Sequence, residues 1–145
     1  MKLKISLLLF VLLFLGGCHK KSINVITDVD DFDVLITTEK VLNYDMRLYS
    51  ECEEGHIPGF MCFGPDIVED YQMKIDKLVQ GIVLLHTDKD QKIVVITSDD
   101  RYALNMLQAL EVEGYTALYY YRGGYHQYVK DKQDNYIPET GCNCE

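Results

Sequence analysis

Two short stretches of the sequence carry side chains that are able to do chemistry. Residues 97–101 (TSDDR) follow an apolar run and offer hydroxyl, carboxylate and guanidinium groups. Close to the C-terminus, Cys142 and Cys144 are separated by one residue, so their thiols are able to form a readily reduced disulfide or to bind a soft metal such as Cu(I) or Zn(II). Many α/β proteins keep a nucleophile or an anion in a loop of the first kind, but this loop contains no cysteine.

The composition of the loop 97–101 favours helix capping over catalysis. Thr97 and Ser98 have no evident base partner, and an unactivated hydroxyl is a poor nucleophile at neutral pH. The carboxylates of Asp99 and Asp100 would repel an anionic substrate, whereas a carboxylate suits the N-terminus of a following helix. We therefore expect Ser98, Asp99 or Asp100 to cap a helix. Divalent-cation binding and a modified catalytic loop are the alternatives.

The remaining cysteines leave several pairings open. Besides Cys18 the chain has four cysteines, an even number that permits one or two disulfides in an oxidising compartment. Cys62 is either a small buried hydrophobe or a partner for Cys52. Cys142 and Cys144 either bridge to Cys52 or Cys62, act together as a redox or metal site, or belong to a solvated tail without a role.

Hydrophobic periodicity predicts the elements that position these residues. Apolar residues at steps of three and four predict helices over 66–86 and 101–113, and Gly114 ends the second. Residues 28–39 fit either a helix or a strand. Continuous apolar or β-branched runs predict strands at 23–27, 41–45, 93–97 and 117–121, with a weaker one at 60–63. Strands that are apolar on both faces and alternate with helices predict an α/β fold with a covered parallel sheet.

The N-terminus is typical of an exported protein. Two lysines precede the apolar segment 5–15, which is too short for a comfortable membrane span. The stretch LGGC that follows resembles the lipobox of bacterial lipoproteins. This resemblance implies removal of a signal peptide, residues 1–17, and acylation of Cys18. Residues 18–22 would then tether the protein to the extracytoplasmic side of the cell membrane.

The charge of the chain limits its partners. Loss of the signal peptide removes two lysines and no acidic residue, which lowers the formal net charge from −9 to −11. Such an acidic protein argues against nucleic acid as a partner. With 48% hydrophobic and 26% charged residues, the 145-residue chain has the composition of one compact domain. No feature calls for a cofactor.

Three segments together resemble one family, the rhodanese-like domains. YDMR (44–47) is similar to the family's Asp-x-Arg strand end, and EEGHIPGF (53–60) to its Glu-x-Gly-His-Ile-Pro-Gly-Ala segment. YYYRGGYHQY (119–128) is similar to its late strand, Gly-Gly turn and aromatic-bearing helix. The resemblance implies a doubly wound domain over 23–132 with a parallel sheet of about five strands, followed by an irregular tail at 133–145. Its structural motif residues are Asp45, Gly55, His56, Pro58, Gly59, Gly123 and Gly124.

The resemblance also places the family's catalytic loop between the predicted strand 93–97 and the predicted helix 101–113. Active members have Cys-x-x-Gly-x-Arg there, and the cysteine thiolate carries a sulfane sulfur as a persulfide. In this sequence Thr97 falls at the cysteine position, the glycine is missing, and Arg101 comes one residue early. Because threonine does not hold a persulfide, the resemblance implies a sulfurtransferase fold without the family's nucleophile.

Two arginines resemble the strand-end and loop arginines of the family. Arg47 and Arg101 either bind a small anionic ligand without turning it over or form salt bridges with Asp45, Asp99 or Asp100. His56, in GHIPG, is expected to hold its turn together by hydrogen bonds.

The leading hypothesis is a membrane-anchored binding or regulatory module without sulfurtransferase activity. Its partner would be an unknown protein or a small anionic ligand. One alternative is a sulfurtransferase or thiol-redox protein that uses Cys142 and Cys144, or Cys62. The other is a lipoprotein that binds a soft metal.

Overall fold

The computed structural model describes residues 21–141. The predicted signal peptide, Cys18 and the pair Cys142 and Cys144 lie outside this range. The elements, in chain order, are β1 (Ile23–Ile26), α1 (Val29–Ile36), β2 (Leu42–Asp45), α2 (Tyr49–Glu54), β3 (Met61–Cys62), η1 (Val68–Asp70), α3 (Tyr71–Leu85), β4 (Ile93–Ile96), α4 (Asp100–Val112), β5 (Leu118–Tyr121), α5 (Gly124–Lys132) and η2 (Gln133–Asn135).

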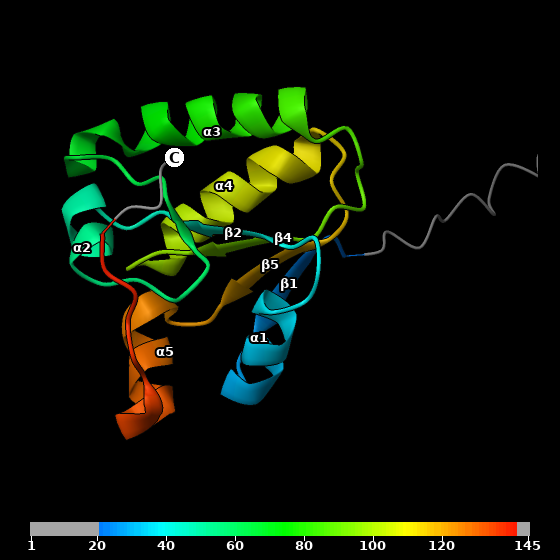
Figure 1. Cartoon of the computed structure of the whole chain (residues 1–145). Coiled ribbons are helices and arrows are strands. Elements are labelled where there is room, and N and C mark those ends of the chain that lie inside the picture. Colours follow the sequence, from blue (N-terminus) through cyan, green and yellow to red (C-terminus); the bar gives the residue numbers. More distant parts are fainter. Residues whose placement is uncertain (1–20, 142–145) are drawn as a thin grey trace, which may run out of the picture.

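The five strands form one sheet in the order β1-β5-β4-β2-β3, and each neighbouring pair is parallel. Helices α3 and α4 cover one face, and α1 and α5 cover the other (Figure 1). The predicted α/β fold with a doubly wound parallel sheet is therefore confirmed. Within residues 21–141, none of the helices combines the length and the apolar character needed to cross a membrane.

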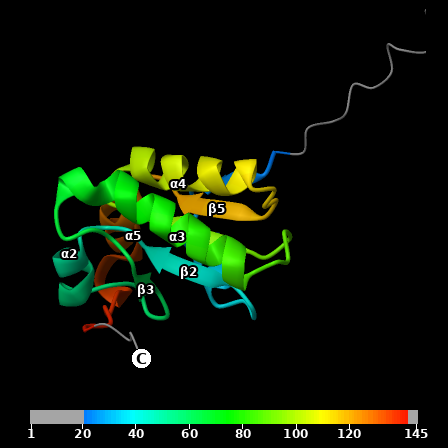
Figure 2. The ribbon, with the colours of Figure 1, turned by 90° about the horizontal axis from the view of Figure 1, so that it is seen from above.

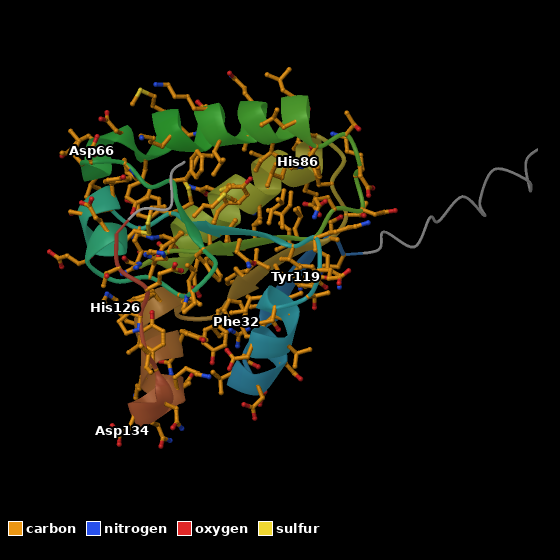
Figure 3. The ribbon with its side chains drawn as sticks, viewed as in Figure 1. Phe32, Asp66, His86, Tyr119, His126 and Asp134 are labelled. Carbon is orange, nitrogen blue, oxygen red and sulfur yellow. A yellow bond between two sulfur atoms is a disulfide. The ribbon has the colours of Figure 1, made fainter. Side chains whose placement is uncertain are left out.

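The central strand β4 shows why an apolar run forms a buried strand. Because side chains alternate across a strand, Ile93 and Val95 pack in the cluster under α3 and α4, while Val94 and Ile96 pack against the helices of the opposite face. Phe32 of α1 lies on that opposite face (Figure 3). Its ring lies 4.9 Å from the ring of Tyr121. Each such buried side chain contributes about 1.5–3 kcal/mol.

Most predicted elements are present with ends shifted by one or two residues. The ambiguous segment 28–39 contains helix α1, and the Asp28 carboxylate caps it by accepting from the backbone N–H groups of Asp30 and Asp31 at 3.0 Å. The predicted helix 66–86 is shorter, because a turn of 3-10 helix, η1, precedes α3. Helix α2 was not predicted, since six residues are too few to show a helical period.

The segment after α5 does not leave the domain, although the sequence indicated an irregular tail. After η2 it runs back across the GHIPG turn, where His56 and Glu139 pair as an antiparallel bridge. Their backbone N–H groups each donate to the other's carbonyl oxygen at 2.9 Å. The Gly141 N–H then donates to the Glu53 carbonyl oxygen at 2.9 Å, which ties the end of the described chain to α2.

Candidate functional site at the carboxyl edge of the sheet

The loops that follow β2, β4 and β5 meet at one edge of the sheet, here called the carboxyl edge. In a parallel sheet every strand ends at the same edge, and ligands of open α/β sheets bind there. The sequence-predicted residues Arg47 and Thr97 lie in the loops after β2 and β4, and Gly124 begins α5 directly after the loop that follows β5. The fold therefore brings together segments that lie up to 77 residues apart in the sequence.

The loop after β4 is closed by its own side chains. Thr97 is 1% exposed, and its hydroxyl donates to the Asp99 carbonyl oxygen at 2.7 Å. Asp99 caps α4, since its carboxylate accepts from the Arg101 N–H at 2.9 Å. The Asp100 carboxylate accepts from the Gly123 N–H at 2.9 Å. Two carboxylates of the chain thus occupy backbone donors that would otherwise be free to bind an anion.

Arg101 is paired with the residue that caps its helix. Its guanidinium lies 2.6 Å from the Asp99 carboxylate, and the pair is exposed to solvent. The side-chain and backbone hydrogen bonds from Arg101 lower the pKa of Asp99 from 3.8 to about 2. The loop arginine therefore neutralises a neighbouring carboxylate, which is one of the two roles that the sequence left open.

Arg47 is also paired, in this case inside the domain. Its guanidinium makes an ion pair with the buried Asp45 carboxylate at 2.7 Å and donates to the Gly55 carbonyl oxygen at 2.6 Å. The guanidinium carbon lies 3.4 Å from the centroid of the Tyr125 ring. Arg47 thus links the end of β2 to the GHIPG turn and to α5, and its charge is balanced by Asp45 within the domain.

A hollow of about 300 Å³ opens beside this loop, lined by Arg47, Glu51, Glu54, Gly55, Tyr125, His126 and Pro138. It borders the loop directly, because Ser98 Oγ lies 3.4 Å from the Glu51 carboxylate and the Tyr125 N–H donates to the Thr97 carbonyl oxygen. Two carboxylates line this hollow, whereas its one guanidinium is already neutralised by Asp45. The charge of the hollow favours a cationic or neutral group over a small anion.

The Gly-Gly turn allows α5 to approach the loop this closely. Gly124 has a φ of +66°, and a Cβ atom built there would lie 2.0 Å from the Thr97 carbonyl oxygen. Gly123, the residue before it, provides the N–H that binds Asp100. Close backbone packing therefore requires glycine at 124, whereas at 123 the positive φ of +80° favours it.

The GHIPG turn is held by a disulfide and by His56. Cys52 and Cys62 are bonded to each other, with both residues buried, and His56 Nδ1 donates to the Cys52 carbonyl oxygen at 2.9 Å. Among residues 21–141 only Cys52, His56 and Cys62 form a cluster of three metal-ligand side chains. Because the two sulfurs are bonded together, they are not available as thiolate ligands. The φ of Gly59 is +82°, and Pro58 lies in the same turn.

The disulfide decides between two of the pairings left open by the sequence. Cys62 pairs with Cys52, so the alternative in which Cys142 or Cys144 bridges to either of them is wrong. Cys62 is also not a free thiol at the loop. Through Asp45 it is in register with Ile96 two strands away, at a spacing of about 10 Å.

Sequence reasoning missed five residues that line the hollow: Glu51, Glu54, Tyr125, His126 and Pro138. The aromatic-bearing segment after the Gly-Gly turn was the only available signal for Tyr125. Glu51 and Glu54 lie on the unpredicted helix α2, and Pro138 lies in the segment that was expected to be irregular.

A five-stranded parallel sheet with a loop-lined site at its carboxyl edge defines a doubly wound α/β domain. The sequence model described as "Rhodanese-like domain" matches residues 28–131. The chain therefore belongs to the rhodanese-like domain family, and its fold is of the sulfurtransferase type. A search of curated protein sequences found no match to this chain.

Several solved structures share this fold at low sequence identity. The Alr3790 protein from Anabaena sp. is 19% identical, with a TM-score of 0.60, over 79% of this chain and 81% of that one. The human single-domain sulfurtransferase TSTD1 is 17% identical, with a TM-score of 0.54, over 74% and 96%. The BH2092 protein from Bacillus halodurans is 18% identical, with a TM-score of 0.55, over 79% and 75%. At these identities the similarity concerns the fold alone.

Proposed function

We propose that this protein is a membrane-anchored, extracytoplasmic rhodanese-like domain that binds a partner and lacks cysteine-persulfide sulfurtransferase activity. The anchoring rests on the LGGC stretch before and at Cys18. The loss of activity rests on the loop after β4, where Thr97 stands at the position that carries the nucleophile in active members of the family.

One observation carries the proposal: the carboxylates of Asp99 and Asp100 accept the backbone N–H groups at the mouth of the loop. An active persulfide site needs free donors that converge on an anionic sulfur. Here two of the donors, the N–H groups of Arg101 and Gly123, are bonded to carboxylates, and the hydroxyl of Thr97 is buried and donates to a backbone carbonyl. The loop therefore lacks the nucleophile, and two of the donors beside it are not free to bind an anion.

The charges that line the hollow indicate which type of partner it would bind. Glu51 and Glu54 place negative charge beside the loop, and Arg47 is balanced by Asp45. A small anion such as thiosulfate would meet unbalanced carboxylates. We propose a protein partner that places a basic or uncharged polar group in the hollow.

A thiosulfate and cyanide assay tests the loss of activity. The wild-type protein and a Thr97→Cys variant are both expected to form no thiocyanate, because in the variant the N–H groups of Arg101 and Gly123 remain bonded. A calorimetric titration of the wild type with thiosulfate is expected to give no heat of binding. An active single-domain sulfurtransferase serves as the positive control. Thiocyanate formation by the Cys142→Ser, Cys144→Ser double variant would refute the proposal.

A second candidate function uses the cysteines at the C-terminus. It is favoured by the hydrogen bond from the Gly141 N–H to Glu53, because this bond brings the chain to α2 one residue before Cys142. A thiolate of Cys142 or Cys144 would attack the sulfane sulfur of thiosulfate, break its S–S bond and release sulfite. Cyanide would then remove the outer sulfur as thiocyanate and restore the thiolate.

Intact-protein mass spectrometry with peptide mapping separates the two candidates. After reduction and exposure to thiosulfate, a gain of one sulfur at Cys142 or Cys144 that is lost on addition of cyanide would establish the second function. No gain, or equal labelling of every thiol, would leave the binding function. The Cys142→Ser and Cys144→Ser variants are the matched controls, since neither residue takes part in the Cys52–Cys62 disulfide that holds the GHIPG turn.

A further inference from the structure

The end of the domain at which the described chain begins carries exposed apolar side chains. Leu84, Leu85 and Val112 are 80%, 78% and 85% exposed. Leu84 and Leu85 end α3, and Val112 ends α4. In both orientations of the ribbon these two helices end on the side from which residues 21 and 22 enter β1 (Figures 1 and 2). We call these three residues the apolar end.

The contacts around Tyr115 join the parts of this end. The Tyr115 hydroxyl donates to the carbonyl oxygens of Ile82 and His86, which ties the segment after α4 to the end of α3. Tyr115 also lines a hollow that it shares with Ser22 and Val112. In Figure 3, His86 lies at this end of the molecule, whereas His126 and Asp134 lie on the opposite side.

The length of the tether limits how far this end is able to stand from a lipid anchor. Only four peptide units separate Cys18 from Ser22, and a fully extended chain of that length spans no more than about 14 Å. A bilayer that holds acyl chains on Cys18 is therefore within that distance of Ser22. The apolar end lies on the side of the domain at which this tether joins it.

From this geometry we infer that Leu84, Leu85 and Val112 form a membrane-contact surface that inserts into the interfacial region of the bilayer. The inference rests on the lipid anchor of the proposed function. Lys89 lies over the Tyr115 ring at 4.0 Å, but Asp88 and Asp90 flank it in the sequence, and Glu111 and Glu113 flank Val112. The contact is therefore apolar and does not require anionic lipid. It orients the domain with the carboxyl edge of the sheet away from the membrane.

The absence of tryptophan from the sequence makes the contact measurable, because one introduced Trp is then the only indole in the protein. Leu85→Trp and Val112→Trp report on the apolar end. Ile137→Trp is the matched control, since Ile137 is 80% exposed and is next to Pro138, which lines the hollow at the carboxyl edge. The control cancels the intrinsic preference of Trp for membrane interfaces.

The lipidated protein is purified from membranes and reconstituted into phosphatidylcholine vesicles, with or without brominated acyl chains. For Leu85→Trp and Val112→Trp we expect the emission to shift to shorter wavelength and to lose intensity with brominated lipid. Ile137→Trp is expected to show neither change. Far-UV circular dichroism verifies that each variant keeps the wild-type fold.

Two different results would overturn the inference, and they have different meanings. If the protein sediments with the vesicles but all three variants emit alike, the domain stands clear of the bilayer and the anchor is unaffected. If mass spectrometry finds no acyl group on Cys18 and the protein stays in the aqueous phase, the anchoring itself is wrong, and the membrane-contact surface fails with it.

Discussion

Arg47, a candidate for anion binding in the sequence, instead forms a buried ion pair with Asp45 that belongs to the interior of the domain. The Asp45 carboxylate is fully buried and is balanced by the Arg47 guanidinium. We expect Arg47→Met to lower the free energy of unfolding by about 3–5 kcal/mol, because the carboxylate would be left buried without a counter-ion. Urea denaturation measures this loss. The double variant with Asp45→Asn should recover part of it, and a loss below about 1 kcal/mol would mean that the pair behaves like an exposed salt bridge.

Asp99 makes the loop sensitive to acid. Its pKa is lowered to about 2 in the folded protein, mainly by hydrogen bonds from Arg101. Its stabilising effect is therefore fully present above its ordinary pKa of 3.8 and is lost as the pH falls toward 2. Thermal melting should give a higher melting temperature for the wild type than for Asp99→Asn at pH 5. The difference should disappear as the pH falls from 4 to 2. A difference that does not change over this range would contradict the assigned ion pair.

The roles of single residues could be predicted only in part. A cap among Ser98, Asp99 and Asp100 follows from their types and their place before an amphipathic helix. The choice of Asp99 depends on its extended backbone, with φ −136° and ψ 124°, and this conformation is set by the packing of the loop. The Asp100 carboxylate binds the N–H of Gly123, a contact that depends on β5 ending beside β4.

At the scale of elements, the approach of α5 to the β4 loop depends on Gly124. We expect Gly124→Ala to destabilise the protein strongly, because the new methyl group would lie 2.0 Å from the Thr97 carbonyl oxygen. Gly114→Ala is the matched control: its φ is also positive, at +92°, but its Cβ would meet open space. In this control the free energy of unfolding should fall by about 1–2 kcal/mol, from backbone strain alone. If chemical denaturation gave the same loss of unfolding free energy for both variants, the close contact at Gly124 would not contribute to stability.

The elements that the sequence predicted are those with a strong local pattern. Apolar runs of strand length mark β4 and β5, and apolar spacing marks α3 and α4, because one face of each element must be buried. Helix α2 and the return of residues 136–141 across the GHIPG turn have no such pattern. They depend on the Cys52–Cys62 disulfide and on backbone pairing with His56. For this reason the hollow was missed, although the loop beside it was identified.

At the scale of the whole molecule, the disulfide acts on the unfolded chain as well as on the fold. It links residues ten apart, and closing a loop of that length should contribute about 2–3 kcal/mol to stability. The Cys52→Ala, Cys62→Ala double variant is expected to unfold at correspondingly lower urea concentration. Cys142→Ser with Cys144→Ser serves as the control and should leave the midpoint unchanged. Identical midpoints for both double variants would show that the bond adds nothing to stability.

The parallel direction of all five strands gives the domain two poles, with the start of the described chain at one and the loops and Gly141 at the other (Figure 1). This polarity bears on how the protein is handled. A purification tag or fusion partner joined directly after Gly141 would begin at α2, which lines the hollow. Attachment through the N-terminus to a sensor surface would instead present that hollow to the solution. Partner screens are therefore best carried out with the protein immobilised by its N-terminal end.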